Sequence, residues 1–260
     1  MEILSFDLVG KFAHFRKYYS NSSALSFTIP PRTTLIGILA SILGRAKDSY
    51  YEEFMSDKIR LTLTVISPLK KSFHRLNYLK IISKNTENFR GVNGRIQTPF
   101  EVVHPVDIRE QSIRFRIYVS CSENGISTFN ELKSKLLSGE KMFNTSMGIA
   151  AFSASIKNVC VYNDETIKEI SIVNEFVTMK SVVLSENVKE LKFEKSENYK
   201  YNFVEEDLLP ADFKANYDRE LIKMNRVLFT TGDIPLFVKF TGKIYNINNS
   251  KHDFNIQFLD

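Results

Sequence analysis

The clearest pattern of apolar and polar positions lies in the first 45 residues. Residues 2–9 place apolar side chains at every second position, which predicts a strand with Leu4, Phe6 and Leu8 on one face. A polar connection of unusual length, residues 11–32, follows and ends in two prolines that exclude an earlier helical start. Apolar residues then recur at helical spacing over 35–43, which predicts a helix capped by Thr33 or Thr34.

The same alternation returns twice more, at residues 60–66 and 113–119, and predicts two half-buried strands. Thr128 and Glu131 have the spacing of a capping box, so a second helix is expected to open there. A further strand is expected at residues 156–162. The resulting β-α-β-β-α-β order is that of ferredoxin-like sheets, which RNA-recognition (RRM) modules also use.

Between the second and third strands, β-branched and aromatic residues alternate with glycine and proline breakers, which favours a long hairpin that projects as an arm. Beyond about residue 165 the chain reads as further short strands with acidic loops. We therefore expect an α+β fold. It would have a ferredoxin-like domain at 1–164, a hairpin thumb inserted at about 70–112, and a smaller β-rich domain at 165–260.

Composition narrows the class of protein. With 260 residues, 43% of them hydrophobic, the chain can bury a core and is no disordered polymer. No segment approaches the roughly 18 to 20 apolar residues of a membrane span, and Glu2 and Asp7 stand where a secretory signal needs cations. We expect a cytoplasmic protein without membrane contact, in which Cys121 and Cys160 are buried free thiols.

Positive charge is concentrated in the first half. Residues 1–116 hold 18 Lys and Arg against 10 Asp and Glu, whereas residues 117–260 hold 17 against 20. The segment 70–116 alone has ten basic and four acidic residues. A polyphosphate chain is the usual partner of such a surface, because each neutralised phosphate releases a counterion. An ordinary solvated surface explains the charge equally well.

Three stretches carry candidate binding chemistry. Residues 10–19 interleave cations with aromatic rings, a combination suited to single-stranded RNA. Arg32 and the following threonines would offer an anion site at a helix start, although ordinary capping accounts for the threonines too. Residues 145–153 are rich in small side chains, so a backbone or nucleotide could approach closely.

Enzyme hypotheses find less support. The four histidines are scattered, and neither HExxH, paired Cys/His spacing, a Walker motif nor GxGxxG occurs, so we expect no metal or nucleotide cofactor. A metal-independent ribonuclease needs a base and a cation near the phosphate, and His74 with Lys70, Lys71 and Tyr78 could supply them. That alternative stays open.

Two segments, Phe6 to Arg16 and Phe27 to Ala40, resemble the N-terminal signature of the Cas-five family of CRISPR-associated proteins, most closely its type I-B branch. The residues around Met147-Gly148 resemble it more weakly. The resemblance implies a ferredoxin-like domain with a hairpin thumb between its second and third strands. It also implies a subunit of a Cascade surveillance complex, acting in antiviral defence.

Such a subunit grips the 5′ handle of the CRISPR RNA (crRNA), caps the filament of repeated backbone subunits and docks the large subunit that reads the PAM, so target DNA is met only indirectly. Carried over to this sequence, the expected handle contacts are His14, Arg16, Lys17, Tyr18, Arg32, Thr33, Ser146, Met147, Gly148 and Ile149. The expected thumb contacts, assigned by charge, are Arg75, Asn77, Lys80, Arg90 and Arg95.

One branch of the family cuts the precursor RNA with a Tyr-Lys-His set that has no clear match here. In branches like the one this sequence resembles, a separate ribonuclease cuts, so we expect binding without catalysis. The metal-independent endoribonuclease is the alternative, and a free-standing RNA-recognition module is the third hypothesis.

Overall fold

The computed structural model describes residues 1–20, 23–82, 89–192, 203–214, 219–249 and 252–260. Its central sheet has the strand order β4-β7-β1-β8, with every neighbouring pair antiparallel. These strands are β1 (Ile3–Gly10), β4 (Ile59–Val65), β7 (Ile113–Cys121) and β8 (Ala154–Tyr162). The four strands expected from the sequence are therefore present, and the first of them occupies an inner position.

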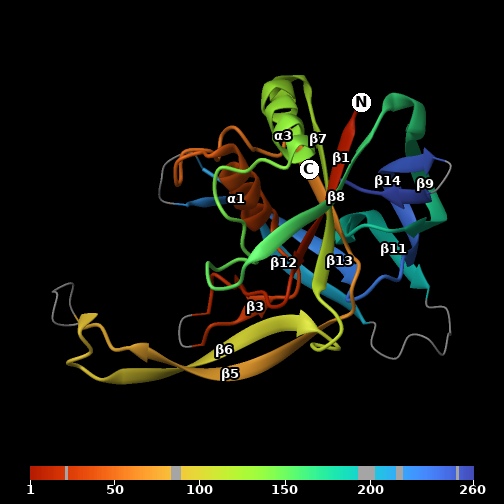
Figure 1. Ribbon diagram of the computed structural model, residues 1–260. Coiled ribbons are helices and arrows are strands. Elements are labelled where there is room, and N and C mark those ends of the chain that lie inside the picture. The colour runs from red at the N-terminus through yellow and green to blue at the C-terminus, as the bar shows by residue number, and fades with distance from the viewer. Residues whose placement is uncertain (21–22, 83–88, 193–202, 215–218, 250–251) are drawn as a thin grey trace.

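Two helices complete this part of the molecule, α1 (Arg32–Leu43) and α3 (Ile126–Ser138). Their apolar residues share one buried cluster with the β1 side chains that the alternation assigned to the core. The β-α-β-β-α-β order predicted from the sequence is thus observed, with α1 after β1 and α3 after β7. Figure 1 shows both helices on the same side of the sheet.

Both predicted helix caps are wrong. Pro31 precedes α1, and its carbonyl accepts from the amides of Thr34 and Leu35, while no threonine side chain caps the helix. Helix α3 begins at Ile126, two residues before the expected capping box, and the Thr128 hydroxyl donates to Glu53 instead. The Pro31 carbonyl takes the place expected of a threonine side chain at α1, and the long-range contact with Glu53 that takes up Thr128 is not visible in local sequence.

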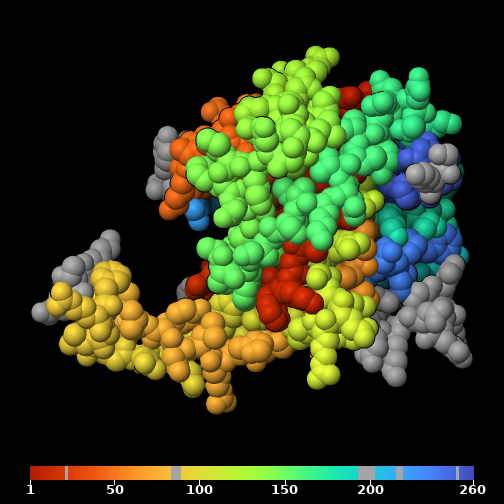
Figure 2. Space-filling model, viewed as in Figure 1, coloured from red at the N-terminus to blue at the C-terminus, as the bar shows by residue number. Residues whose placement is uncertain are grey.

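The expected thumb is an antiparallel hairpin of β5 (Leu69–Leu79) and β6 (Arg95–Pro105), placed between β4 and β7. Residues 83–88 of the predicted insertion, including Lys84, lie outside the described residues. Figure 1 shows the hairpin reaching away from the body, and in Figure 2 the surface between thumb and body is hollowed. At its base, two short strands, β2 (Phe15–Arg16) and β3 (Ser26–Phe27), lie beside β6, bridged by Ala13 and Ala24.

The second half is built from strands, as expected. One sheet has the order β10-β13-β12, and in the other β14 pairs with β9, β11 and β15. These strands are β9 (Ile167–Met179), β10 (Val183–Leu184), β11 (Val188–Lys192), β12 (Val204–Phe213), β13 (Leu221–Thr230), β14 (Leu236–Asn249) and β15 (His252–Ile256).

The two halves share their buried clusters. Val227 and Phe229 of β13 lie in the same cluster as β1, α1 and α3. On the other face of the central sheet, Tyr118 is 2% exposed and packs with residues of β14 and β15. The sheet face that an RNA-recognition module leaves open is here partly covered by the chain's own C-terminal strands.

Two further findings concern exposure and membranes. Cys160 is exposed and Cys121 is partly exposed, so the expectation that both thiols are buried is wrong. Cys160, the more exposed of the two, lies on the edge strand β8. Within the described part of the chain, no helix has the length and apolar character needed to cross a bilayer.

Candidate nucleic-acid interface

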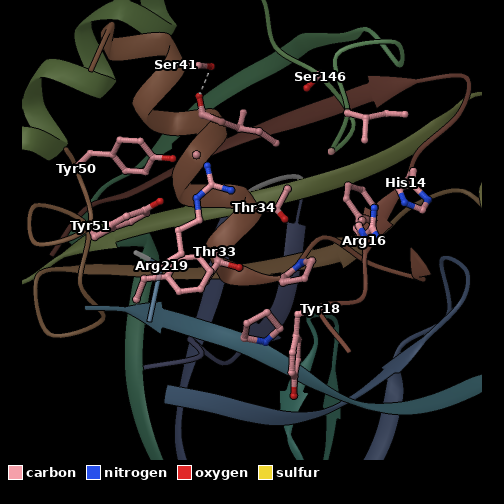
Figure 3. A pocket seen from close by; sticks show the side chains of 18 of the residues that line it. His14, Arg16, Tyr18, Thr33, Thr34, Ser41, Tyr50, Tyr51, Ser146 and Arg219 are labelled. Carbon is pink, nitrogen blue, oxygen red and sulfur yellow. Dashed lines mark hydrogen bonds between the residues drawn. The ribbon is translucent and has the colours of Figure 1, made fainter. Parts of the chain in front are cut away.

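A groove of about 580 Å³ brings together three stretches that the sequence analysis singled out separately. The loop after β1 contributes His14, Arg16 and Tyr18; the first turn of α1 contributes Thr33 and Thr34; the 144–149 loop contributes Asn144, Ser146, Gly148 and Ile149. Figure 3 shows His14, Arg16, Tyr18, Thr33, Thr34 and Ser146 among the side chains that line the groove. The convergence of segments more than 100 residues apart is what makes this groove the candidate interface.

Within the loop after β1, Arg16 and Tyr18 are exposed, whereas His14 is only 2% exposed. The His14 ring stacks on Phe100 of the thumb base, with centroids 4.1 Å apart, and its Nδ1 lies 2.7 Å from the Glu101 carbonyl oxygen. Burial lowers the pKa of His14, which favours the neutral ring. His14 therefore fixes the loop to the thumb, while Arg16 and Tyr18 face the groove.

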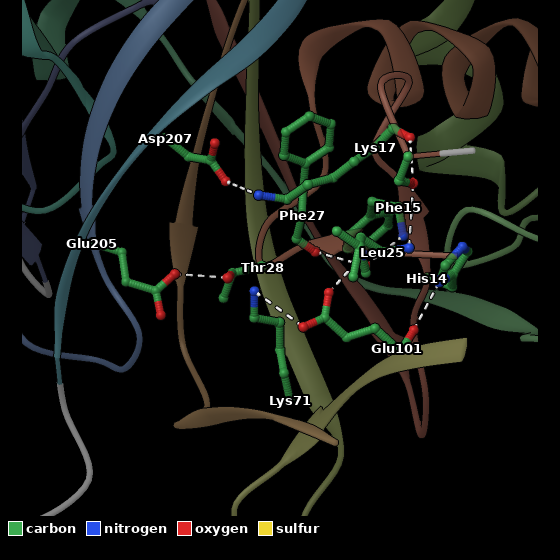
Figure 4. A network of polar contacts seen from close by, with 12 residues as sticks. His14, Phe15, Lys17, Leu25, Phe27, Thr28, Lys71, Glu101, Glu205 and Asp207 are labelled. Atoms are coloured by element: carbon green, nitrogen blue, oxygen red, sulfur yellow. Dashed lines mark hydrogen bonds and ion pairs between the residues drawn. The ribbon is translucent and has the colours of Figure 1, made fainter. Parts of the chain in front are cut away.

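Lys17, an expected RNA contact, is engaged within the molecule. Its Nζ lies 3.0 Å from Asp207 Oδ2 on β12 and 4.9 Å from the centre of the Phe27 ring. Burial lowers the pKa of Lys17, but its hydrogen bonds and charge interactions with Asp207 and Tyr19 together outweigh burial, and the net shift is upward. Figure 4 shows this contact together with a second one between the two halves of the chain. There the Thr28 hydroxyl donates a hydrogen bond to the Glu205 carboxylate at 2.7 Å.

Arg32 was expected to contact the RNA, but its side chain is 2% exposed and points into the protein. Its guanidinium pairs with Asp212 of β12 and donates to the carbonyls of Phe54 and Ile59 at 2.7 and 2.6 Å. A buried guanidinium committed to these partners has no surface to offer an RNA phosphate. Arg32 joins the start of α1 to the second half of the chain, and only Thr33 and Thr34 of this turn face the groove.

The 144–149 loop is held against the loop after β1 by close backbone contact. The His14 amide donates to the Met147 carbonyl at 3.0 Å, and Met147 is completely buried. Gly148 has φ +91°, and a Cβ there would lie 2.1 Å from the His14 carbonyl oxygen. Only glycine fits this position. The expected close approach is real, but it is between two loops, and Ser146 and Ile149 line the groove beside it.

The thumb presents two different faces. Residues opposite each other in an antiparallel pair share a face, and successive residues alternate. The pairs Asn77–Gln97 and Leu79–Arg95 therefore lie with Arg75 on one face, which carries the cations Arg75 and Arg95 beside the exposed Phe73 and Leu79. The pairs Leu76–Thr98 and Tyr78–Ile96 lie on the other face, with Lys70 toward the base of the hairpin. Arg75, Asn77, Lys80, Arg90 and Arg95 are all exposed.

The residues considered for a ribonuclease are not gathered into one site. His74 and Tyr78 are four residues apart on one strand, roughly 13 Å at the usual rise. His74 Nε2 lies 3.0 Å from the Ser72 hydroxyl, and Lys71 faces the opposite side, 3.6 Å from Glu101. Lys70 lies on the same face as His74, four residues before it on the strand.

Three further residues that line the groove were not predicted from the sequence. Tyr50 and Tyr51 come from the connection after α1, and Arg219 comes from the second half of the chain, just before β13. None stands in a recognisable motif, and Arg219 meets its partner Asp48 across 171 positions. The adjacent tyrosines at 50 and 51 were the one local signal.

The fold is shared with solved CRISPR proteins. A CRISPR protein from Archaeoglobus fulgidus superposes with a TM-score of 0.56 and 10% sequence identity, over 98% of each chain. A chain described as "CRISPR RNA-guided surveillance complex" gives a TM-score of 0.50 and 11% identity, over 91% of this chain and 90% of that one. At such identities the likeness concerns the fold. No curated protein matches the sequence.

The sequence itself also resembles a known family over part of its length. The family model described as CRISPR-associated protein (Cas_Cas5) matches residues 3–108, which include both signature segments and the thumb. The resemblance to the Cas5 family inferred from the sequence is confirmed over these residues. The type I-B branch stays a prediction.

Proposed function

We propose that this protein is a subunit of a Cascade-type surveillance complex and holds the 5′ handle of crRNA without cutting it. The observation that carries the proposal is the groove, in which Arg16, Tyr18 and Ser146 from two distant loops line one continuous surface. Exposed cations and rings of this kind contact phosphates and stack on bases. The similarity of fold to a chain of an RNA-guided surveillance complex supports the same assignment.

The central sheet and its two helices would then be the ferredoxin-like domain of the subunit, with the RNA on the groove side. An RNA-recognition module binds on the open sheet face, but here Tyr118 on that face is buried against Phe254. The RNA strand would instead run from the groove, past the loop after β1, to the cationic face of the thumb. The base of the thumb touches that loop through Ala13 and Ala24, so the two surfaces are continuous.

The opposite face of the thumb suits a protein partner. Tyr78 and Ile96 lie opposite each other there and are 44% and 51% exposed. A two-stranded hairpin with exposed apolar side chains is marginally stable alone and gains from a partner surface. We assign this face to the neighbouring backbone subunit of the filament, with the large PAM-reading subunit docking elsewhere, as the family resemblance implies.

The test uses a synthetic RNA with the handle sequence of the protein's own CRISPR locus. Its binding is measured by fluorescence anisotropy at salt concentrations from about 50 to 300 mM. We expect affinity to fall steeply with salt, because each phosphate contact releases a counterion. Arg16→Ala with Tyr18→Ala removes one cation and one stacking ring, and the pair should weaken binding by about tenfold or more.

Three outcomes would argue against the proposal. Wild-type protein that binds the handle no better than an unrelated RNA would exclude handle recognition. Cleavage of repeat RNA in the presence of a chelator, lost in a His74→Ala variant, would favour the ribonuclease. A protein that stays monomeric when co-expressed with neighbouring subunits and guide RNA would indicate a free-standing module.

A further inference from the structure

The second half of the chain places one cation in the groove, and nothing in the function proposed so far uses it. Arg219 precedes β13, lines the groove with Tyr50 and Tyr51, and has a side chain that is 54% exposed. In Figure 3 it lies at the end of the groove opposite His14 and Arg16. The expected RNA contacts outside the thumb all come from residues 14–149, so Arg219 would extend the interface to the C-terminal strands.

Its position is set by two other residues. Arg219 Nε donates to Asp48 Oδ1 at 2.9 Å, and the Tyr51 hydroxyl donates to the same carboxylate oxygen. Tyr51 is 3% exposed, and its ring packs against Phe213 with centroids 5.3 Å apart. A carboxylate anchored by a buried tyrosine thus holds the guanidinium, and the hydrogen bond to Asp48 raises the pKa of Arg219.

The backbone at this contact is unusual. Asp48 has φ +61° and Arg219 has φ +56°, both in the left-handed region. A residue with a side chain reaches this region only at an energetic cost. Both partners of one ion pair carry that cost, and such strain is found where a binding site fixes a side chain. The pair also ties the connection after α1 to the start of β13.

The charge and geometry suit a phosphate. A guanidinium has five N–H donors, and the bond to Asp48 uses the one on Nε. Lys47 Nζ lies 3.9 Å from the other oxygen of Asp48, so Lys47, Asp48 and Arg219 together carry one net positive charge. The planar fork of an arginine binds phosphate oxygens in pairs. The partly exposed Tyr50 ring, 5.0 Å from the Tyr51 ring, lies beside it for a base to pack against.

We propose that Arg219 binds a phosphate of the RNA strand held in the groove, and that Asp48 and Tyr51 are positioning residues for it. This inference rests on the proposed function, since it concerns RNA in the same groove. The C-terminal half is then a direct part of the RNA interface and both halves of the chain hold one strand.

The experiment compares two arginines of the full-length protein. Arg219→Ala removes the groove cation, and Arg226→Ala removes a β13 cation of similar exposure, 62%, that lies outside the groove residues and pairs with Glu206 at 3.5 Å. With the handle RNA as probe, Arg219→Ala should weaken binding about tenfold or more and lower the salt slope by about one. Arg226→Ala should change neither quantity.

Asp48→Asn separates positioning from net charge. Removing a negative charge near RNA would tighten binding if only charge mattered. If Asp48 positions Arg219, the variant binds more weakly, and adding Arg219→Ala to it costs little more. Arg219→Lys keeps the charge without the planar fork and should lie between wild type and Arg219→Ala. Thermal melts of each variant identify any loss that comes from unfolding.

A scan with single methylphosphonate links in the RNA locates the contact. Wild-type protein should lose affinity at one link that no longer matters in Arg219→Ala. Equal binding by wild type and Arg219→Ala, or tighter binding by Asp48→Asn, would overturn this inference and leave the proposed function standing. Wild-type protein that fails to bind the handle would overturn both.

Discussion

Single residues in this protein decide which parts of the groove are surface and which are scaffold. His14 and Arg32 belong to the stretches that resemble RNA contacts, yet both are buried, at 2% and 3% exposure. The sequence could indicate that these residues belong to the site, but it could not show whether their side chains face the groove or the interior. Asp212 lies 180 positions from Arg32 and Glu101 lies 87 positions from His14, so no local pattern contains the partner that draws either side chain inward.

Gly148 offers a direct test of how the two loops are held together. Gly148→Ala would place a Cβ 2.1 Å from the His14 carbonyl and keep φ at +91°. We expect a loss of about 1–2 kcal/mol from the left-handed backbone and a further loss of about 1–3 kcal/mol from the clash. Urea unfolding measures the sum, and weaker handle binding should accompany it.

Gly139→Ala is the matched control, because Gly139 also has a left-handed φ of +75° but has nothing within 4 Å of an added Cβ. It should show the backbone cost alone and leave handle binding unchanged. Equal stability of the two variants would mean that the contact between the loops is unimportant.

Among the elements, the strands and helices that bury one face were predictable and the contacts between elements were not. Alternation located β1, β4 and β7 because each has one apolar face, and breakers located the thumb. The division of the thumb into two faces depends on the register between β5 and β6. The register is set by how the two strands pair in space, which the sequence does not show. Choosing the thumb contacts by charge alone therefore left out the opposed pair Tyr78 and Ile96.

The two faces of the thumb should separate in function. Arg75→Glu with Arg95→Glu reverses two cations on one face, and Tyr78→Ser with Ile96→Ser removes an opposed apolar pair on the other. We expect the first variant to weaken RNA binding and lower the salt slope by about two. The second should keep RNA binding and lose co-purification with the backbone subunit.

Lys168→Glu with Lys189→Glu reverses two exposed charges in the second half and serves as control. It should bind RNA almost as wild type does. An equal loss from this control and from the Arg75/Arg95 variant would show that net charge, and not the thumb face, determines binding.

Across the whole molecule, the two segments expected as domains are packed through shared clusters. Val227 and Phe229 complete the cluster under α1 and α3, and Ile256 and Phe258 cover Tyr118. Composition and strand pattern could show a change of character near residue 165. They could not show that the later strands cover the central sheet, because burial between distant segments leaves the same alternation as burial within one segment.

A fragment of residues 1–164 should therefore fail to fold on its own. It would expose the core face that Val227 and Phe229 cover, and we expect poor solubility and no cooperative thermal transition by circular dichroism. Removal of the outer thumb is the contrasting variant, with Leu76 joined to Thr98 through Asn-Gly in place of residues 77–97. That shortened chain should melt like the full-length protein, and a stable 1–164 fragment would contradict this prediction.

The register of β5 and β6 also limits how the thumb can change length during evolution. An insertion or deletion of one residue within either strand would move the side chains beyond it to the other face of the hairpin. Arg75 and Tyr78 would then no longer face the neighbours proposed for them. Changes of two residues preserve the assignment of every side chain. Relatives that keep both contacts should therefore differ by even numbers of residues along these strands.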